Sequence, residues 1–287
     1  MKAVLGQFLL SREFQASAGG AALRALIRKS SGVYNYSLDF LVDSQTTERP
    51  HYAYCMANAA KLAQRTGIKR ISALEFGVAG GNGLSFMVDF ARRIEQRTGV
   101  SIACYGFDTG EGMPEPEGPE DLHYWFRAAQ YPMDEAALRR KLPEAELVLG
   151  NVRETVPAFV EKFRPPPIAI ILNDVDYYSS TRDNLALFDN AAAQAEHFLP
   201  QIFMYMDDII GSAAEMYGPF NGPLLAINEY NQNNPDVKIH LNQNLLPLHH
   251  VAYRHQIYYV HLFKHPQYST FLGDAQQGDI HEALKLR

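Results

Sequence analysis

Four aspartates that follow runs of apolar residues are the side chains in this sequence best placed for chemistry: Asp174, Asp176, Asp207 and Asp208. Residues two apart lie on the same side of an extended chain, so Asp174 and Asp176 point the same way. Carboxylates gathered in one crevice repel one another strongly unless a cation or protons lie between them. Oxygen ligands without His or Cys suit Mg²⁺, Mn²⁺ or Ca²⁺ better than zinc. The four acids therefore predict a divalent-metal site, and the alternative is that they cap helices along a polar rim.

A second stretch suited to ligand binding is rich in glycine and reads Glu75-Phe76-Gly77-Val78-Ala79-Gly80-Gly81-Asn82-Gly83. Apolar residues precede it and a helical pattern begins at Leu84, which predicts a buried strand, a tight turn and a helix N-terminus. Glycines let the backbone approach a ligand closely, and free N–H groups at a helix start favour polar or anionic groups. The spacing differs from the dinucleotide fingerprint G-x-G-x-x-G, which disfavours an NAD(P)-dependent oxidoreductase. A glycine-rich turn without a ligand is the alternative.

Two more polar side chains stand where further apolar runs end. An acid at the position of Asp108 can accept hydrogen bonds from both ribose hydroxyls of a nucleoside. The alternative is a loop carboxylate that caps Thr109 or Gly110. Asn151 follows the next apolar run, where it can meet the edge of an adenine or serve as a helix N-cap, and these two roles are compatible.

The segment after Asp108 predicts a loop over the ligand. Residues 111–120 are acidic and rich in proline, and Tyr124, Trp125 and Phe126 follow closely. Such a composition does not suit a core element, so the segment is a candidate lid whose aromatic side chains cover a ligand. The alternative is a solvated loop anchored by its tryptophan.

Regular alternation of apolar runs and amphipathic patterns predicts the elements that position these residues. Strands are expected at 71–76, 102–107, 146–149, 168–172 and 202–206, and two more at 237–241 and 257–263 complete a seven-stranded sheet. Helical patterns cover 84–94, 152–163 and 185–199. Continuous apolar strands alternating with such helices predict an α/β fold with a mostly parallel sheet covered on both faces. Ligands bind beyond the carboxyl ends of such strands, which is where the candidate residues lie.

The first part of the chain differs in character from the rest. Residues 1–66 read as mostly helical and predict a helical cap or oligomerisation region, with plain packing helices as the alternative, and residues 67–287 form the α/β domain. The apolar run at 3–10 is too short for a signal peptide. A possible homo-oligomer follows from the helices of this region.

The charge and the cysteine content of the sequence disfavour several classes of partner and one class of fold. The net charge of −6 gives no electrostatic reason to expect a nucleic-acid or membrane partner. The two cysteines, Cys55 and Cys104, argue against a disulfide scaffold and for a cytoplasmic protein.

Taken together, these stretches resemble the macrocin O-methyltransferase-like family of enzymes, which use S-adenosylmethionine (SAM) and a divalent metal to methylate sugar hydroxyls. The matching segments, in order within residues 70–235, are 75–78, 107–116, 150–157, 174–181, 207–208 and 222–230. The resemblance implies a Rossmann-like class I methyltransferase fold, with Mg²⁺ or Mn²⁺ bound by Asp174, Asp207 and Asp208 and with Asp176 as the general base. It also implies a SAM site that comprises Glu75, Gly77, Ala79, Ser85, Asp108, Thr109, Gly112 and Asn151.

The hypothesis that follows is a metal-dependent O-methyltransferase that acts on a vicinal diol, most simply on the sugar of a glycosylated natural product or glycan. A divalent ion bound to two neighbouring hydroxyls lowers their pKa, so that a carboxylate such as Asp176 can remove the proton. A catechol-type acceptor fits the same chemistry. The alternatives from other classes are an NAD(P)-dependent oxidoreductase and a non-catalytic SAM-binding protein, and a mere binder has no need for four crowded carboxylates.

Overall fold

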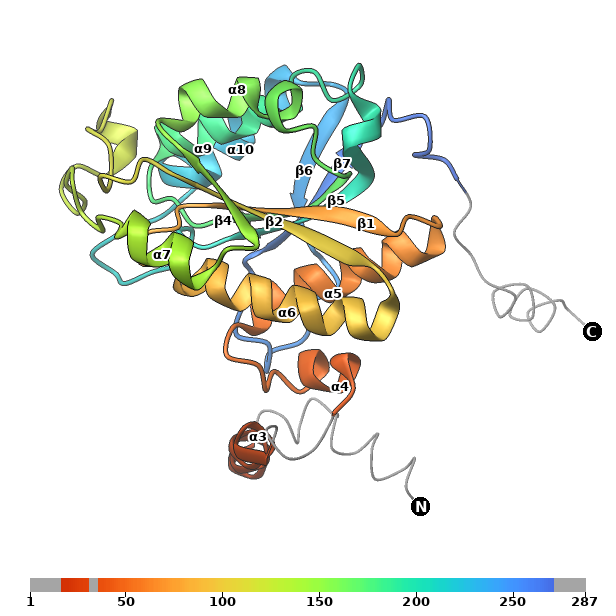
Figure 1. Ribbon diagram of the computed structural model, residues 1–287. Coiled ribbons are helices and arrows are strands. Elements are labelled where there is room, and N and C mark those ends of the chain that lie inside the picture. The colour runs from red at the N-terminus through yellow and green to blue at the C-terminus, as the bar shows by residue number, and fades with distance from the viewer. Residues whose placement is uncertain (1–16, 31–35, 271–287) are drawn as a thin grey trace, which may run out of the picture.

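The computed structural model describes residues 17–30 and 36–270, and within them a seven-stranded sheet is covered by helices on both faces (Figure 1). The strands are β1 (Arg70–Phe76), β2 (Ser101–Asp108), β3 (Ala145–Leu149), β4 (Ile168–Asn173), β5 (Phe198–Met206), β6 (Val237–Leu241) and β7 (Ile257–Leu262). The α-helices are α3 (Ala18–Ser30), α4 (Leu38–Asp43), α5 (Pro50–Arg65), α6 (Asn82–Thr98), α7 (Glu135–Lys141), α8 (Val152–Phe163), α9 (Tyr178–Leu185) and α10 (Gly222–Asn233).

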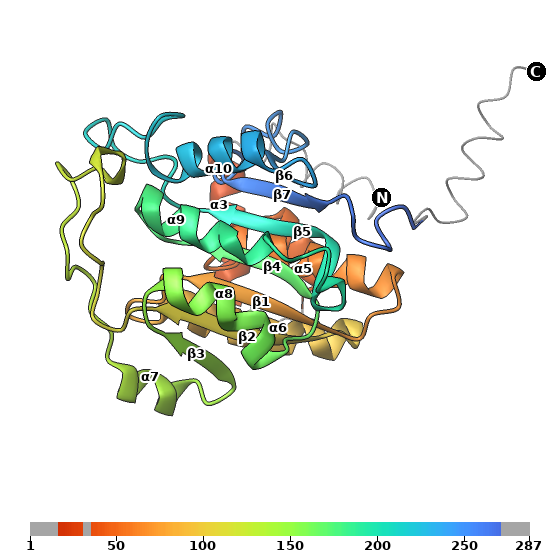
Figure 2. The same cartoon turned by 90° about the horizontal axis from the view of Figure 1, so that it is seen from above.

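The strand order is β3-β2-β1-β4-β5-β7-β6, which Figure 2 shows from above. The first five strands run parallel, and β7 is antiparallel to both of its neighbours. The predicted seven-stranded, mostly parallel sheet is thus confirmed. Phe76 pairs with Phe107 on one side and with Asn173 on the other, and Asn173 pairs with Met206. The residues that follow these strands therefore emerge side by side at one edge of the sheet.

Apolar side chains on both faces explain why the central strands are buried. Every residue of β4 is buried, as are the last six of β1, because helices cover the two sides. Figure 1 shows α5 and α6 on one face and α8, α9 and α10 on the other. The contact face of α6 includes Leu84, Met87 and Ile94, all of them fully buried. Replacing a fully buried Leu84 by alanine would cost about 2–5 kcal/mol of stability.

The helix predicted over residues 185–199 is wrong. The helix α9 ends at Leu185, short 3-10 turns follow at Ala186–Phe188 and Ala195–His197, and β5 begins at Phe198. Phe198 pairs with Ile168 in the sheet and its ring lies 6.2 Å from that of Phe188. Strand pairing and buried aromatic contacts therefore outweigh the helix propensity of the alanines in this segment.

The N-terminal region is partly integrated into the sheet domain. The helix α5 places Tyr52, Ala53 and Met56 in the same hydrophobic core as β1 and α6, and Figure 1 shows α3 and α4 beyond it. The predicted boundary after residue 66 thus follows a helix that packs directly on the sheet. The role of this region as a cap or oligomerisation element stays a prediction, and the apolar run at 3–10 lies outside the described residues.

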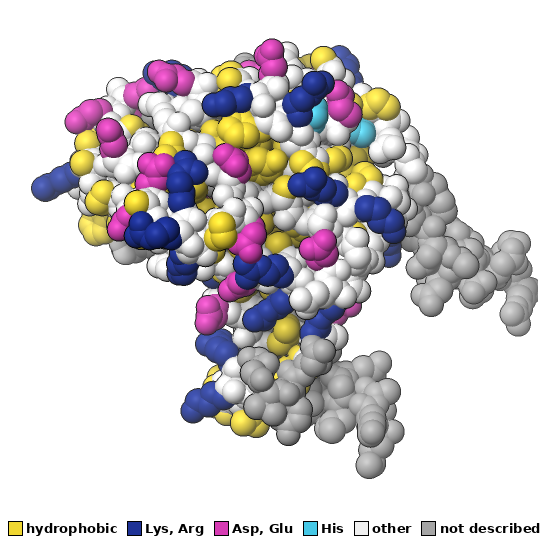
Figure 3. All heavy atoms as spheres, in the orientation of Figure 1, with side chains coloured by type: hydrophobic (Ala, Val, Ile, Leu, Met, Phe, Trp, Pro, Cys, Tyr) yellow, Lys and Arg dark blue, Asp and Glu magenta, His cyan; other side chains and the backbone are white. Residues whose placement is uncertain are grey.

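Charged side chains of both signs share the surface, and the two cysteines are unpaired. Lys and Arg are interspersed with Asp and Glu over the face shown in Figure 3. Cys55 and Cys104 are both free and buried. Within residues 17–30 and 36–270, none of the helices has the length and apolar character needed to cross a membrane.

Candidate active site

A cavity of about 340 Å³ lies at the carboxyl ends of the parallel strands. It is bounded by the turn after β1, by the β2–α7 loop (residues 109–134) and by the segments that follow β4 and β5. The predicted site residues that line it are Glu75, Gly77, Ala79, Asp108, Thr109, Gly112, Asn151, Asp174, Asp176, Asp207 and Asp208. Ser85 is not among the lining residues. It lies in the first turn of α6, where its N–H donates to the carbonyl of Gly81.

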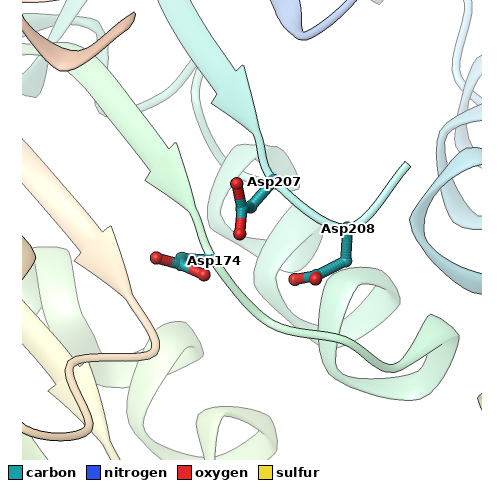
Figure 4. Close-up of side chains that lie close together, drawn as sticks. All are labelled: Asp174, Asp207 and Asp208. Atoms are coloured by element: carbon teal, nitrogen blue, oxygen red, sulfur yellow. The ribbon is translucent and has the colours of Figure 1, made fainter. Parts of the chain in front are cut away.

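Three of the predicted metal ligands form one cluster. Asp174 follows β4, and Asp207 and Asp208 follow β5. Each offers one carboxylate oxygen, and these atoms all lie within 4.8 Å of one another (Figure 4). The cluster exists because Asn173 and Met206 are paired neighbours in the sheet and the N–H of Asp207 donates to the carbonyl of Asn173 at 2.9 Å.

Burial and mutual repulsion disfavour negative charge in this cluster. Burial is the main cause that raises the pKa of Asp174, and the neighbouring charge of Asp207 raises it further. Burial is also the main cause that raises the pKa of Asp208, and the neighbouring charge of Asp176 raises it further. A divalent cation would relieve this repulsion, and an all-oxygen donor set suits Mg²⁺ or Mn²⁺. The residues present therefore fit the predicted ion.

Asp176 lines the cavity next to the cluster. Burial raises its pKa to about 6, although a hydrogen bond with Asp208 opposes the shift. A carboxyl group with this pKa is mostly ionised near pH 7 and still able to take up a proton, which is the requirement for a general base.

Two tyrosine hydroxyls contact carboxylates of the cluster. The hydroxyl of Tyr205, a residue of β5, donates to Oδ1 of Asp207. The hydroxyl of Tyr217, from the β5–α10 loop (residues 207–221), lies 3.5 Å from Oδ1 of Asp208. Gln256 adds a bond from its Nε2 to the carbonyl of Asp207 at 2.9 Å. The carboxylate of Asp207 is therefore held by Tyr205 and its backbone by Gln256, and Tyr217 lies next to the carboxylate of Asp208.

The turn after β1 needs glycine at its first position. Gly77 has φ +87°, and a Cβ atom on it would lie 1.9 Å from the carbonyl oxygen of Asp174. The backbone of the turn thus packs directly against the segment that carries the metal cluster. Gly77 brings the predicted cofactor-binding turn and the predicted metal site into contact.

Asp108 organises this turn through its carboxylate. Its Oδ2 accepts the N–H groups of Val78 and Ala79, both at 2.9 Å, and its Oδ1 accepts the N–H of Gly110 at 2.8 Å. The capping role toward Gly110 is therefore confirmed. A carboxylate oxygen has two lone pairs, so Oδ1 keeps acceptor capacity for a hydroxyl in the cavity. The contact with a ribose stays a prediction.

Asn151 is both an N-cap and a lining residue. Its Oδ1 accepts the N–H of Arg153 at 2.9 Å at the start of α8. The capping interpretation is confirmed, and the adenine contact stays a prediction.

The β2–α7 loop is anchored by a buried acid and a phenylalanine. Asp121 is 0 % exposed and accepts the N–H and the hydroxyl of Ser179 at the start of α9, both at 2.8 Å. Phe126 packs with Leu122 and Tyr177 in a small buried cluster, whereas Trp125 is 45 % exposed. The alternative of a loop anchored by its tryptophan is wrong as to the residue, because Phe126 occupies the interior position.

The β2–α7 loop, which lines the cavity, is joined to the β5–α10 loop, and both loops carry exposed apolar side chains. The hydroxyl of Tyr124 in the β2–α7 loop donates to the carbonyl of Glu215 in the β5–α10 loop at 2.8 Å. Both loops lie at the same end of the sheet in Figure 2. Their exposed large apolar residues are Tyr124, Trp125, Tyr131, Ile210, Met216 and Phe220.

Sequence patterns did not reveal several residues of the site. Arg49 lines the cavity, and the hydroxyl of Tyr52 donates to Oε1 of Glu75 at 2.7 Å and lies 3.4 Å from Oδ2 of Asp174. Both residues belong to the N-terminal region, whose position across the sheet has no signature in the sequence. Tyr131 also lines the cavity, and its backbone adopts φ +60°, which is strained for a bulky residue.

Comparison with known proteins identifies the fold. No model of a protein family matches the sequence, and no curated protein matches it. Two similar solved structures are the calicheamicin methyltransferase CalS11, with a TM-score of 0.50, and the O-methyltransferase NovP, with a TM-score of 0.51. They are 17% and 14% identical to this chain, which covers 93% and 98% of their lengths with 85% and 84% of its own. The chain therefore has the Rossmann-like α/β fold of class I methyltransferases.

Proposed function

We propose that this protein is a SAM- and divalent-metal-dependent O-methyltransferase that methylates a hydroxyl of a vicinal diol on a sugar. The observation that carries the proposal is the cluster of Asp174, Asp207 and Asp208 beside the turn after β1, within one cavity. The likeness in fold to CalS11, described as a calicheamicin methyltransferase, and to the O-methyltransferase NovP supports it.

Each part of the cavity has a role in this reaction. SAM supplies an electrophilic methyl group, and Glu75, Asp108 and Asn151 would bind it along the ends of β1, β2 and β3. A divalent ion held by the three clustered aspartates would act as a Lewis acid on the diol. Methyl transfer is an in-line displacement, so most of the catalytic effect comes from holding nucleophile and methyl group in line.

Asp176 completes the site as the general base. It lines the same cavity as the metal cluster, and its hydrogen bond with Asp208 orients it. The proton of the acceptor hydroxyl would pass to the carboxylate of Asp176 as the oxygen attacks the methyl group, the bond between this methyl group and the sulfur breaks, and S-adenosylhomocysteine leaves. Tyr131 and Met113 would keep water out of the cavity around these atoms.

The exposed apolar side chains of the two loops support an acceptor sugar attached to an apolar body. Trp125 and Phe220 are exposed on the two loops that are joined through Tyr124 and Glu215. Exposed apolar side chains on loops next to a cavity are typical of a ligand-binding surface, and Tyr131 of the β2–α7 loop lines the cavity itself. The sugar would then reach the metal cluster while the apolar body contacts the loops.

A catechol is the second candidate acceptor. It offers the same pair of neighbouring oxygens to a metal ion, and the exposed rings of Trp125 and Tyr131 offer faces for stacking. Parallel assays with SAM carrying a labelled methyl group, on aryl glycosides with free vicinal hydroxyls and on simple catechols, distinguish the two. Label transfer to catechols alone would exclude the sugar.

Calorimetric titration tests the cofactor and the ion together. We expect the protein to bind SAM, and to bind Mg²⁺ in a separate titration after treatment with EDTA. The variant Asp207→Asn should lose the Mg²⁺ signal and the activity while keeping its affinity for SAM. Asp89→Asn, on the exposed face of α6, is the matched control and should behave as the wild type. Full activity of Asp207→Asn in EDTA would rule out the metal site.

A further inference from the structure

The five residues that follow Asp176 all carry a hydroxyl group, and they are Tyr177, Tyr178, Ser179, Ser180 and Thr181. Three of these hydroxyls have hydrogen-bond partners inside the protein. The bonded pairs are Tyr178 with Glu229 at 2.6 Å, Ser179 with Asp121 at 2.8 Å and Thr181 with Asn173 at 3.1 Å. None of these three hydroxyl residues lines the cavity.

The other two hydroxyl residues, Tyr177 and Ser180, do line the cavity. They are 1 % and 8 % exposed, and neither hydroxyl has a hydrogen-bond partner among the described residues. Tyr177 is the N-cap residue of α9 and Ser180 follows three positions later, so the two side chains lie close together at the start of the helix. Two hydroxyls without partners thus lie at the cavity, next to the proposed base Asp176.

The surroundings of Tyr177 within the protein supply no partner for its hydroxyl. Leu122 and Phe126 of the β2–α7 loop pack against it, with the two aromatic rings 6.3 Å apart, and their apolar side chains cannot accept a hydrogen bond. A buried polar group without a partner is costly and rare in folded proteins. A ligand in the cavity is the remaining source of a partner, and a small shift of the side chain toward the cavity brings the hydroxyl into contact with it.

The two groups are suited to a neutral ligand group that both donates and accepts. Burial raises the pKa of Tyr177 to about 12, and the charge of Asp121 raises it further, so the phenol keeps its proton near pH 7. The hydroxyls of tyrosine and serine each offer one donor and free acceptor capacity. A sugar hydroxyl has the same two capacities and can therefore bond with both side chains.

We propose that Tyr177 and Ser180 bind a third hydroxyl of the acceptor, adjacent to the two that the metal site would hold. This inference rests on the proposed function and narrows its acceptor to a sugar with three neighbouring free hydroxyls. A simple catechol has two oxygens, both used at the metal, and leaves Tyr177 and Ser180 unpaired. A site built to bond a hydroxyl discriminates against analogues that lack it, because its own polar groups then have no partner.

Three aryl glycosides and catechol test this role. The probes are p-nitrophenyl β-D-xylopyranoside, with hydroxyls on three consecutive carbons, and its 2-deoxy and 4-deoxy analogues, each of which keeps one vicinal diol. With labelled SAM and Mg²⁺, the wild type should methylate the xyloside with a kcat/KM about 3- to 10-fold above that of one deoxy analogue, the effect of one neutral hydrogen bond. Tyr177→Phe and Ser180→Ala should lose this preference and keep their kcat/KM for that analogue and for catechol within about 2-fold.

Two readouts that do not depend on turnover make the test specific. The Tm of Tyr177→Phe without ligand should equal or exceed that of the wild type, because the variant lacks a buried hydroxyl that has no partner. Its affinity for S-adenosylhomocysteine in calorimetry should be unchanged. Tyr178→Phe is the matched control. It loses the bond to Glu229, so its Tm should fall while the preference for the xyloside remains.

Each other outcome overturns the inference. Equal losses on all acceptors in Tyr177→Phe would mean that the hydroxyl maintains the shape of the cavity, a lower Tm would mean that it has a partner inside the protein, and weaker binding of S-adenosylhomocysteine would mean that it contacts the cofactor. Methylation of the xyloside without any preference would remove this inference alone. Methylation of catechol alone, or of no probe, would remove the proposed sugar as well, and failure to bind S-adenosylhomocysteine would remove the proposed function itself.

Discussion

A Cβ atom on Gly83 would lie 1.8 Å from Oε1 of Glu75. The absence of a side chain at Gly83 therefore lets α6 begin directly over the buried end of β1. We expect Gly83→Ala to displace Glu75, to destabilise the fold by about 1–3 kcal/mol through overpacking, and to weaken SAM binding. Urea unfolding and calorimetry measure the two effects. Gly218→Ala is the matched control, because a Cβ atom there would meet nothing within 4 Å and Gly218 is not among the lining residues of the cavity; equal losses in both variants would contradict the explanation.

Asp176→Asn should separate catalysis from binding. The variant keeps the shape of the side chain but cannot accept the proton of the acceptor hydroxyl, so kcat should fall about 10²- to 10⁴-fold. Affinity for SAM should remain unchanged, because the assigned cofactor contacts lie at the ends of β1, β2 and β3. Single-turnover rates and calorimetry with the same preparation check both statements. An unchanged kcat would remove Asp176 as the base.

The stability of the metal-free protein should fall as the pH rises. Burial raises the pKa of Glu75 from 4.5 to about 8, so the native state keeps a proton that the unfolded chain releases between these values. The free energy of unfolding therefore decreases over this range and is unaffected below it. Glu75→Gln carries no titrating group, so its Tm should fall less than that of the wild type as the pH rises from 4.5 to about 8. Thermal unfolding in EDTA measures the difference, and parallel curves would refute it.

Removal of the buried acid in the β2–α7 loop should loosen the mouth of the cavity. Asp121→Ala leaves the N–H and the hydroxyl of Ser179 without their acceptor, at a cost of about 1–3 kcal/mol. Hydrogen exchange of residues 119–126 should accelerate, and KM for the acceptor should rise. Glu115→Ala, an exposed acid in the same loop, should do neither. Unchanged exchange in Asp121→Ala would show that Phe126 alone suffices as the anchor.

Replacement of the exposed phenylalanine of the β5–α10 loop should affect binding of the acceptor and leave the stability of the fold nearly unchanged. Phe220 is 85 % exposed, so Phe220→Ser should change stability by no more than about 0.5 kcal/mol. If its ring covers the apolar body of the acceptor, KM should rise about 10-fold, in line with the burial of one aromatic side chain. Leu26→Ser on α3, where Leu26 is 63 % exposed, is the control and should leave KM unchanged. A concentration-dependent dissociation of an oligomer in Phe220→Ser would instead assign the side chain to a subunit contact.

The sequence predicted the sheet and the acidic cluster because both depend on local patterns. Apolar runs mark buried strands, and in a parallel sheet the residues after those runs must meet at one edge, which is how Asp174 and Asp207 come together. Arg49 and Tyr52 could not be found in this way, since their place in the cavity depends on how α5 crosses the sheet. The role of Asp121 could not be predicted from the sequence for a related reason. Among the acids of its loop, only tertiary packing distinguishes the one that reaches Ser179.

The position of β7 has a consequence for the synthesis of the protein. This strand lies between β5 and β6 although it is made after both. Until residues 256–262 have left the ribosome, β5 has an open edge beside Asp207, the bond from Gln256 to the carbonyl of Asp207 cannot form, and β6 has no partner in the described sheet. A nascent chain can therefore assemble the glycine-rich turn early. The segment that carries Asp207 gains its second neighbouring strand and the bond from Gln256 only after β7 has been translated.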